Sequence, residues 1–115
     1  MEGEVGVIEE DKGDVLVLRI KGRLDAVSSP VTEKKVSDII DDGKLKIAMD
    51  FAGVDYLSSA GMRMLLATTK KLKTLSGQFV VFGVKDNVMD VLKMSGFDHV
   101  LQLVASEDEA LQQLS

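Results

Sequence analysis

Short runs of aliphatic residues alternate with segments of helical periodicity along most of this chain. The runs lie at residues 15–20 (VLVLRI), 45–51 (LKIAMDF) and 78–83 (QFVVFG). A run that is apolar on both faces is typical of a strand inside a sheet, and a helix after each strand returns the chain for a parallel crossover. The order of the segments therefore predicts an α/β fold, with a mixed, mostly parallel sheet of about five strands and about four helices.

The N-terminal part of the chain predicts an antiparallel hairpin. Residues 5–9 form a weakly alternating strand candidate, and residues 11–14 (DKGD) supply a turn that contains a glycine. The second strand of the hairpin is the run at 15–20, after which we expect residues 22–25 (GRLD) to leave the sheet as a loop. A last short strand is expected at residues 100–104.

Serine, proline and acidic residues mark the expected helix starts. Ser29 followed by Pro30 predicts a start at which the serine caps the helix and the proline takes the first helical position. Asp86 is expected to cap a short helix later in the chain. Ser106, with Glu109 three residues further on, forms a capping box for the final helix.

One longer helix is expected from about Ala60 to Leu75, ended by the Ser-Gly pair at residues 76–77. Its apolar side chains recur at helical spacing and predict one face toward the core. Met64 lies off this stripe, and both an exposed position and partial burial against a neighbouring loop are open for it. The expected core face consists of Met62, Leu65, Leu66, Thr69 and Leu72.

Size and composition indicate a globular protein and argue against several classes of function. With 115 residues, 45% of them hydrophobic, the chain suits one domain over residues 1–115. The net charge of −5 argues against a nucleic-acid partner, and the lack of cysteine excludes disulfides and thiolate chemistry. No apolar run approaches the roughly 20 residues that span a membrane, and no signal-peptide pattern is present, so we expect a cytoplasmic protein.

The residues give little support for catalysis or for a bound cofactor. His99 is the only histidine, and no motif pairs it with a serine or an acid, so an ordinary loop histidine is favoured over a catalytic base. The carboxylates at 41–42 and 107–109 could hold a hard cation loosely, but helix-end and cap roles explain them better. No nucleotide-binding glycine pattern follows any strand, so we expect no cofactor and no metal.

The segment 50–66, DFAGVDYLSSAGMRMLL, places two adjacent hydroxyls where a helix begins. One of Ser58 and Ser59 is expected to cap the helix and the other to be exposed. A phosphate at this place is tolerated by the helix N-terminus and would change what a partner meets. From the residues alone, the capping role and a regulatory role both remain open. Gly61 is expected to let two backbones approach closely.

The stretch VDYLSSAGMRMLL, residues 54–66, resembles the signature of STAS domains, the family of bacterial anti-sigma-factor antagonists. Residues 22–25 (GRLD) match the family's G-x-hydrophobic-D after the second strand. Asp50 followed by Val54 resembles the family's D-x-x-x-V ahead of the site, and residues 93–97 (KMSGF) resemble its late helix end. The order of the elements is also that of the family, so the resemblance covers nearly the whole chain.

The resemblance implies a regulatory binding protein and not an enzyme. In this family the unphosphorylated protein binds and sequesters an anti-sigma factor that is also a serine kinase, which frees a sigma factor. The kinase phosphorylates one serine, binding is lost, and a serine phosphatase restores the active form. By position that serine is Ser59, with Ser58 as the alternate acceptor. The nucleotide stays on the partner, and nothing demands more than a monomer.

The resemblance also places partner-binding residues around Ser59. Asp25 matches the aspartate that lies near the serine in the family. Arg63 follows Ser59 by four residues on the same helix face, where it could hold the phosphate, meet an acidic patch on the partner, or be an ordinary exposed arginine. An exposed Met64 could contact the partner or pack against a neighbouring loop. The expected set is Asp25, Ser58, Ser59, Met62, Arg63 and Met64.

Two other functions remain open at this point. Small STAS proteins also serve as adaptor subunits in stress-signalling and lipid-transport complexes, where the serine need not be phosphorylated. A small serine hydrolase acting through Ser59 would need a base within hydrogen-bond reach, and His99 is the only imidazole that could serve.

Overall fold

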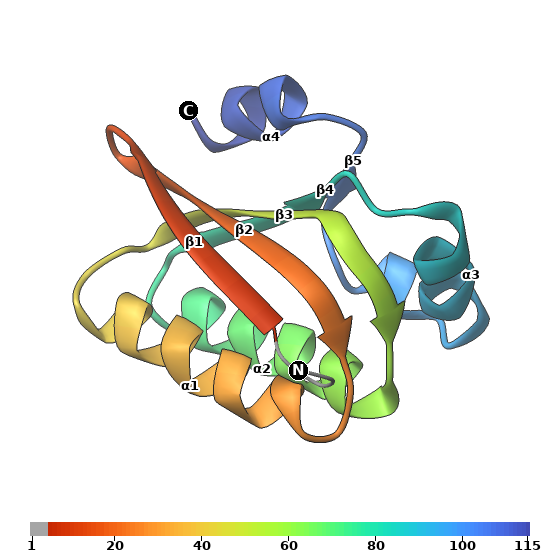
Figure 1. The fold of residues 1–115 in the computed structure, drawn as a ribbon. Helices are drawn as coiled ribbons and strands as arrows, with labels where there is room; N and C mark the ends of the chain where they lie inside the picture. Colours follow the sequence, from red (N-terminus) through yellow and green to blue (C-terminus); the bar gives the residue numbers. More distant parts are fainter. Residues whose placement is uncertain (1–4) are drawn as a thin grey trace.

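The computed structural model describes residues 5–115, in which five strands form one sheet with helices on both of its faces (Figure 1). Residues 1–4 of the predicted domain lie outside the described part. The strands are β1 (Val5–Lys12), β2 (Val15–Leu24), β3 (Lys46–Leu57), β4 (Gln78–Phe82) and β5 (Leu103–Val104). The helices are α1 (Ser28–Asp41), α2 (Ser59–Thr74), α3 (Asp86–Met94) and α4 (Glu107–Leu114), with a 3₁₀ turn η1 (Phe97–His99).

The sheet topology confirms the predicted fold class. The strand order is β1-β2-β3-β4-β5; β1 runs antiparallel to β2, and every later pair of neighbours is parallel. Helices α1, α2 and α3 cover one face of the sheet, and α4 lies over the other (Figure 1). Strand β2 is apolar on both faces because Leu16 and Leu18 enter the larger core, whereas Val15 and Val17 meet Ala110 of α4.

Strands β2 and β3 are longer than expected, and the prediction of a loop at residues 22–25 is wrong. Two register shifts, after Arg19 and after Gly22, keep β2 paired with β3 up to the partners Leu24 and Leu57. The polar and glycine residues that suggested a loop are accommodated at these irregularities, since a bulge bends a strand without ending it. The extension brings the end of β2 beside the start of α2.

Two predicted helix caps are also wrong. Helix α1 begins at Ser28, and its N-cap residue, Val27, has no side chain that could cap it. The Ser29 side chain is buried and has no hydrogen-bond partner among residues 5–115. The backbone N–H groups of Val27 and Ser28 are instead bound by the carboxylate of Asp25, an acceptor from the preceding turn. Helix α3 has Lys85 at its N-cap, and Asp86 lies in the first turn without capping it.

The capping box of α4 is confirmed. Ser106 Oγ accepts a hydrogen bond from the backbone N–H of Glu109 at 3.3 Å. The Glu109 carboxylate accepts in return from the backbone N–H of Ala105 at 3.1 Å, one residue before the cap. This reciprocal pair fixes the start of α4 directly after the edge strand β5.

The buried face of α2 differs from the predicted one, and both positions considered for Met64, exposed or partly buried against a loop, are wrong. Met64 is fully buried, and Thr68 Oγ1 lies 3.8 Å from its sulfur. Helix α1 runs alongside α2 and covers this side of it, so α2 is buried against two surfaces and not only against the sheet. The buried residues of α2 are Gly61, Met64, Leu65, Thr68 and Leu72, while Met62, Leu66 and Thr69 are partly buried.

The C-terminal part also departs from the prediction of a strand at residues 100–104. Only Leu103 and Val104 pair with β4, and the chain before them forms the turn η1, which ends at His99. Glycine 96 precedes η1 with φ of 78°, a left-handed conformation that ends α3 and redirects the chain. Among residues 5–115, no helix combines the length and the apolar character needed to cross a bilayer.

Candidate functional site

Ser58 caps helix α2 and joins it to strand β2. Its hydroxyl accepts a hydrogen bond from the backbone N–H of Gly61 at 3.2 Å and donates to the carbonyl of Leu24 at 2.8 Å. The backbone N–H of Ser58 donates to the same carbonyl at 2.9 Å. Both the donor and the acceptor capacity of this side chain are therefore used inside the fold.

Ser59 has the opposite surroundings. It is the first residue of α2 and is exposed, and its hydroxyl makes no hydrogen bond to any residue between 5 and 115. The free N–H groups of the first helical turn make the local potential positive, which favours a negative group on this hydroxyl. Among residues 5–115, the Ser58 hydroxyl is therefore hydrogen-bonded, whereas the Ser59 hydroxyl is not.

Gly61 allows the close approach on which this arrangement depends. A Cβ atom at this position would lie 2.5 Å from Leu57 Cδ1, 3.0 Å from Leu24 Cβ and 3.1 Å from the Leu24 carbonyl oxygen. Any side chain would push the first turn of α2 away from β2 and lengthen the contacts of Ser58. The prediction of close backbone approach is confirmed.

Asp25 shapes the turn that follows β2, next to Leu24 and therefore next to Ser58. Its Oδ1 accepts from the backbone N–H groups of Ser28 at 2.8 Å and Val27 at 3.0 Å. The hydrogen bond from Ser28 is the main cause that holds the pKa of the Asp25 carboxyl below its ordinary value. The structure places Asp25 beside the serine pair, and its contact with a partner remains a prediction.

Arg63 borders a hollow between α1 and α2. The hollow has a volume of about 340 Å³, and Arg63 is exposed on its rim without an ion pair to any residue from 5 to 115. Lys34 on the opposite wall is paired with Asp38 at 3.3 Å along α1. The hollow is lined by Pro30, Glu33, Lys34, Ser37, Asp38, Ala60 and Arg63.

Met62 packs against the larger core, as its spacing suggested, whereas Met64 departs from the positions considered for it. Met62 is only partly buried, and its sulfur lies 3.2 Å from the hydroxyl of Ser95 at the end of α3. Met64, for which an exposed or a partly buried position was open, is inaccessible to a partner in this structure because it is fully buried in the larger core. Of the six expected partner-binding residues, the structure brings five to one end of the molecule and withdraws Met64.

His99 makes no hydrogen bond to either serine. Its side chain is 86% exposed, and its nearest charged neighbour is Asp98, 3.9 Å from Nε2 to Oδ1. Neither Ser58 nor Ser59 has His99 as a hydrogen-bond partner. In the part of the chain that the structure describes, no three His, Asp or Glu side chains are grouped to hold a metal ion.

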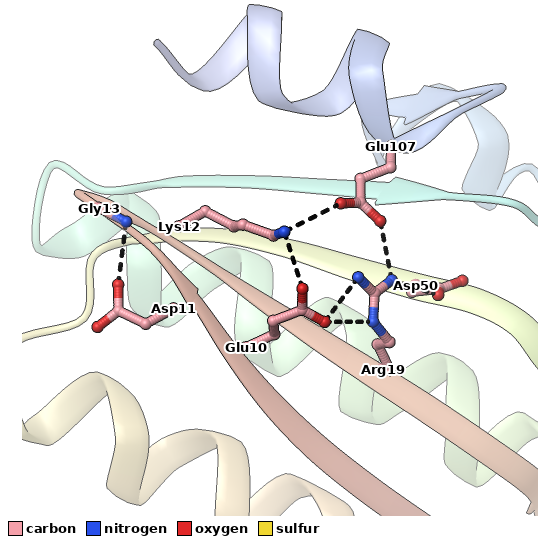
Figure 2. A network of polar contacts seen from close by, with 7 residues as sticks. All are labelled: Glu10, Asp11, Lys12, Gly13, Arg19, Asp50 and Glu107. Atoms are coloured by element: carbon pink, nitrogen blue, oxygen red, sulfur yellow. Dashed lines mark hydrogen bonds and ion pairs between the residues drawn. The ribbon is translucent and has the colours of Figure 1, made fainter.

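A charge cluster on the α4 side of the sheet was not predicted (Figure 2). Arg19 Nη1 donates to Asp50 and to Glu107, each at 2.9 Å, and Nε donates to Glu10 at 2.9 Å. These contacts, with Glu107 the strongest, raise the pKa of Arg19 above its ordinary value. Hydrogen bonds from Lys12 and then Arg19 hold the pKa of the Glu10 carboxyl below its ordinary value. A single arginine inside the aliphatic run VLVLRI was the only sequence signal for this cluster.

Comparison with known proteins identifies the family of the chain. A family model described as the STAS domain matches residues 7–110. BtrV of Bordetella bronchiseptica is 29% identical over 101 residues, which cover 87% of each chain. RsfB of Mycobacterium tuberculosis, named an anti-sigma-F factor antagonist, is 27% identical over 110 residues, covering 93% of this chain and 87% of RsfB.

A solved structure is similar over nearly the same length. The crystal structure of an anti-sigma factor antagonist from Mycobacterium paratuberculosis has a TM-score of 0.86 at 26% sequence identity, covering 96% of this chain and 94% of that chain. The similar fold and a family model that matches residues 7–110 therefore agree. The chain belongs to the STAS domain family.

Proposed function

We propose that this protein is an anti-sigma-factor antagonist whose binding is switched by phosphorylation of Ser59. The unphosphorylated form binds an anti-sigma factor that is also a serine kinase, and so frees a sigma factor. The observation that carries the proposal is the contrast between the two serines. Ser58 has its hydroxyl engaged with Leu24 and Gly61, whereas the hydroxyl of Ser59 is exposed and free.

The electrostatics of the site support a switch that leaves the fold intact. A phosphoserine adds a charge of about −1.5 to −2 at pH 7, and the positive end of α2 accommodates it. Inside a packed interface the same charge would lose its solvation. If this desolvation reduces the binding free energy by about 1–3 kcal/mol, binding weakens roughly ten- to a hundredfold.

The names of the relatives support the partner class. RsfB is named an anti-sigma-F factor antagonist, and the mycobacterial structure is that of an anti-sigma factor antagonist. We extend this to a cytoplasmic monomer without catalytic activity, which a serine phosphatase returns to its active form. The kinase supplies the nucleotide and magnesium, and Ser59 is the substrate of its chemistry.

The test is phosphorylation by the recombinant serine-kinase anti-sigma factors of the source genome with ATP, followed by mass mapping of the modified residue. We expect one phosphate on Ser59, none in Ser59→Ala, and retained phosphorylation in Ser58→Ala. Unphosphorylated wild-type protein should bind the same kinase, and Ser59→Asp should bind at least tenfold more weakly.

Two outcomes would contradict the proposal. A phosphate mapped to Ser58 would move the switch to the capping residue. An unmodified Ser59, together with wild-type binding by Ser59→Asp, would favour an adaptor that works without phosphorylation. Labelling of Ser59 by a serine-reactive phosphonate that requires His99 would instead indicate a hydrolase.

A further inference from the structure

Strand β5 covers only part of the sheet edge that it forms. It lies at the end of the strand order opposite β1, and it pairs with β4 only at Val81 and Phe82 (Figure 1). Residues 78–80, the first part of β4, have no strand beside them on this side among residues 5–115. The edge has a gap where a longer β5 would lie, because the chain at residues 97–99 forms the turn η1 instead.

The backbone of Phe79 faces this gap. The N–H of Gln78 donates to the carbonyl of Leu45 on the β3 side at 2.7 Å. The N–H of Val81 donates to the carbonyl of Gln102 on the β5 side at 2.9 Å. Because alternate residues of a strand direct their backbone groups to opposite neighbours, Phe79 shares the direction of Val81. Its N–H and C=O have no hydrogen-bond partner on that side among residues 5–115, so an added strand could pair with both.

A hollow of about 260 Å³ lies beside this stretch of β4. One wall is the C-terminal half of α2, with Leu72 and Lys73, and another is the chain that leads into β5, with Val100. Phe79 lines the hollow between these walls. Pockets for drug-sized ligands have volumes of about 300–1,000 Å³. The hollow is smaller than these, and its place along a strand edge suits a few residues of extended chain.

The side chains of the hollow indicate the chemistry of the segment that fits it. Val100 is 49% exposed and gives the wall an apolar part. Lys73 is exposed and forms no ion pair with any residue from 5 to 115, and no acidic residue lines the hollow. Asp98, two residues before Val100, is outside the lining and lies 3.9 Å from His99 Nε2. A segment with an apolar side chain and a carboxylate is therefore complementary to this hollow.

A second copy of this chain fits the gap poorly. The other edge strand, β1, ends in the charged residues 9–12 (EEDK), and charges along an edge disfavour strand pairing. Pairing of β1 with the β4 edge of another copy would also leave the same two edges free at the ends of the pair, so it would continue into a fibre. A segment of a different protein avoids both problems.

We propose that the gap beside β4 is a docking site for an extended segment of a partner protein. The segment pairs its backbone with Phe79, in line with β5, packs an apolar side chain against Val100 and places a carboxylate at Lys73. Lys73 lies about 21 Å from Ser59 along α2, by the helical rise of 1.5 Å per residue. Docking at this site is therefore separate from phosphorylation of Ser59 and does not require it.

Amide hydrogen exchange of the free protein tests whether the gap is open. The N–H of Val81 is bonded inside the sheet, so we expect the N–H of Phe79 to exchange at least about tenfold faster. Equal protection of the two amides in dilute protein would show that the chain fills its own gap, and would overturn the proposal. Protection of Phe79 that rises with protein concentration would make a second copy the occupant, and would overturn the partner.

The probe for docking is the peptide acetyl-Glu-Val-Thr-Val-Glu-amide, titrated into the ¹⁵N-labelled chain. We expect the peptide to shift the Phe79 amide signal and slow its exchange, and an analogue N-methylated at the central residues to bind about tenfold more weakly. Val100→Lys should weaken binding about tenfold, and Lys73→Glu up to about fivefold. Val31→Lys, which changes a valine of α1 that is 51% exposed, and Ser59→Asp should both bind as wild type does.

Three results would overturn strand docking: no response of Phe79 at millimolar peptide, equal binding of the N-methylated analogue, or wild-type binding by Val100→Lys. Thermal unfolding of Val100→Lys checks that weaker binding does not come from a lost fold. Because Ser59→Asp is a control in this titration, either proposal can fail while the other stands.

Discussion

Ser58 and Ser59 are neighbours with the same side chain, but Ser58 is the N-cap of α2 and Ser59 is its first residue, so their hydroxyls have different contacts. The hydroxyl of Ser58 bridges Leu24 and Gly61, so it stabilises the junction between β2 and α2. The hydroxyl of Ser59 contributes no such contact in the described structure. Under the proposed function, stability and regulation would belong to separate residues, and a phosphate on Ser59 would leave the Ser58 cap intact.

This division predicts different effects of alanine at the two positions. Ser58→Ala removes the helix cap and should lower the free energy of unfolding by about 1 kcal/mol, within a range of roughly 0.5–2. Ser59→Ala removes no internal contact and should change it by less than about 0.5 kcal/mol. Urea denaturation of both variants measures the difference, and equal losses would mean that Ser59 shares the cap.

At the scale of one element, helix α2 ends at a serine in a left-handed conformation, which glycine adopts more easily. The N–H of Ser76 donates to the carbonyl of Lys73 and that of Gly77 to the carbonyl of Leu72, the paired bonds of a Schellman motif. Ser76 has the left-handed backbone conformation that this motif requires, with φ of 60°. At the equivalent position after α1 and α3 the chain has a glycine, Gly43 and Gly96.

Ser76→Gly should therefore stabilise the protein by up to about 1 kcal/mol, because glycine adopts the left-handed conformation without the steric cost of a Cβ. Gly77→Ala is the contrasting variant, since its Cβ would lie 2.5 Å from the carbonyl oxygen of Leu45 and should destabilise. Thermal melts of the two variants test this assignment. A lower melting temperature for Ser76→Gly would show that the serine side chain contributes more than its backbone strain costs.

At the scale of the whole molecule, the Arg19 cluster connects three elements that are distant in sequence (Figure 2). Glu10 comes from β1, Asp50 from β3 and Glu107 from α4, and all three carboxylates bind one guanidinium. The second core beneath α4 is small, with Ala110 as one of its few helix residues. The ion pairs therefore supplement apolar burial in holding α4 to the sheet.

The lowered pKa of Glu10 makes this connection sensitive to acid. A carboxyl whose native pKa lies below its unfolded value, about 4.3 for glutamate, contributes stability that is present above that pH and is lost as the pH falls through the native pKa. Glu10→Gln should therefore lose less stability than wild type when urea denaturation is repeated at pH values falling below about 4.3. Glu9→Gln, an exposed change on the next residue, is the control and should follow the wild-type curve.

Residue pattern and chain order were enough to predict the mixed α/β sheet, the terminal capping box and a serine cap at the start of α2. These features depend on contacts between residues a few positions apart: a strand's period of two, a helix's period of 3.6, a cap three residues from its N–H group. The same local rules failed at two helix starts. At α1 the carboxylate of Asp25, and not Ser29, accepts from the first N–H groups, and at α3 Asp86 lies inside the first turn and does not cap it.

Local pattern could not anticipate the features that arise between elements. Met64 is buried because α1 lies alongside α2, and Met94 is exposed because nothing in the described chain covers the end of α3. The amino-acid order settles the fold class and the position of Ser58 and Ser59 at a helix start, since both follow from short-range periodicity. Which serine is free, and which side chains surround it, depend on long-range packing of β2, α1 and α3 around that start.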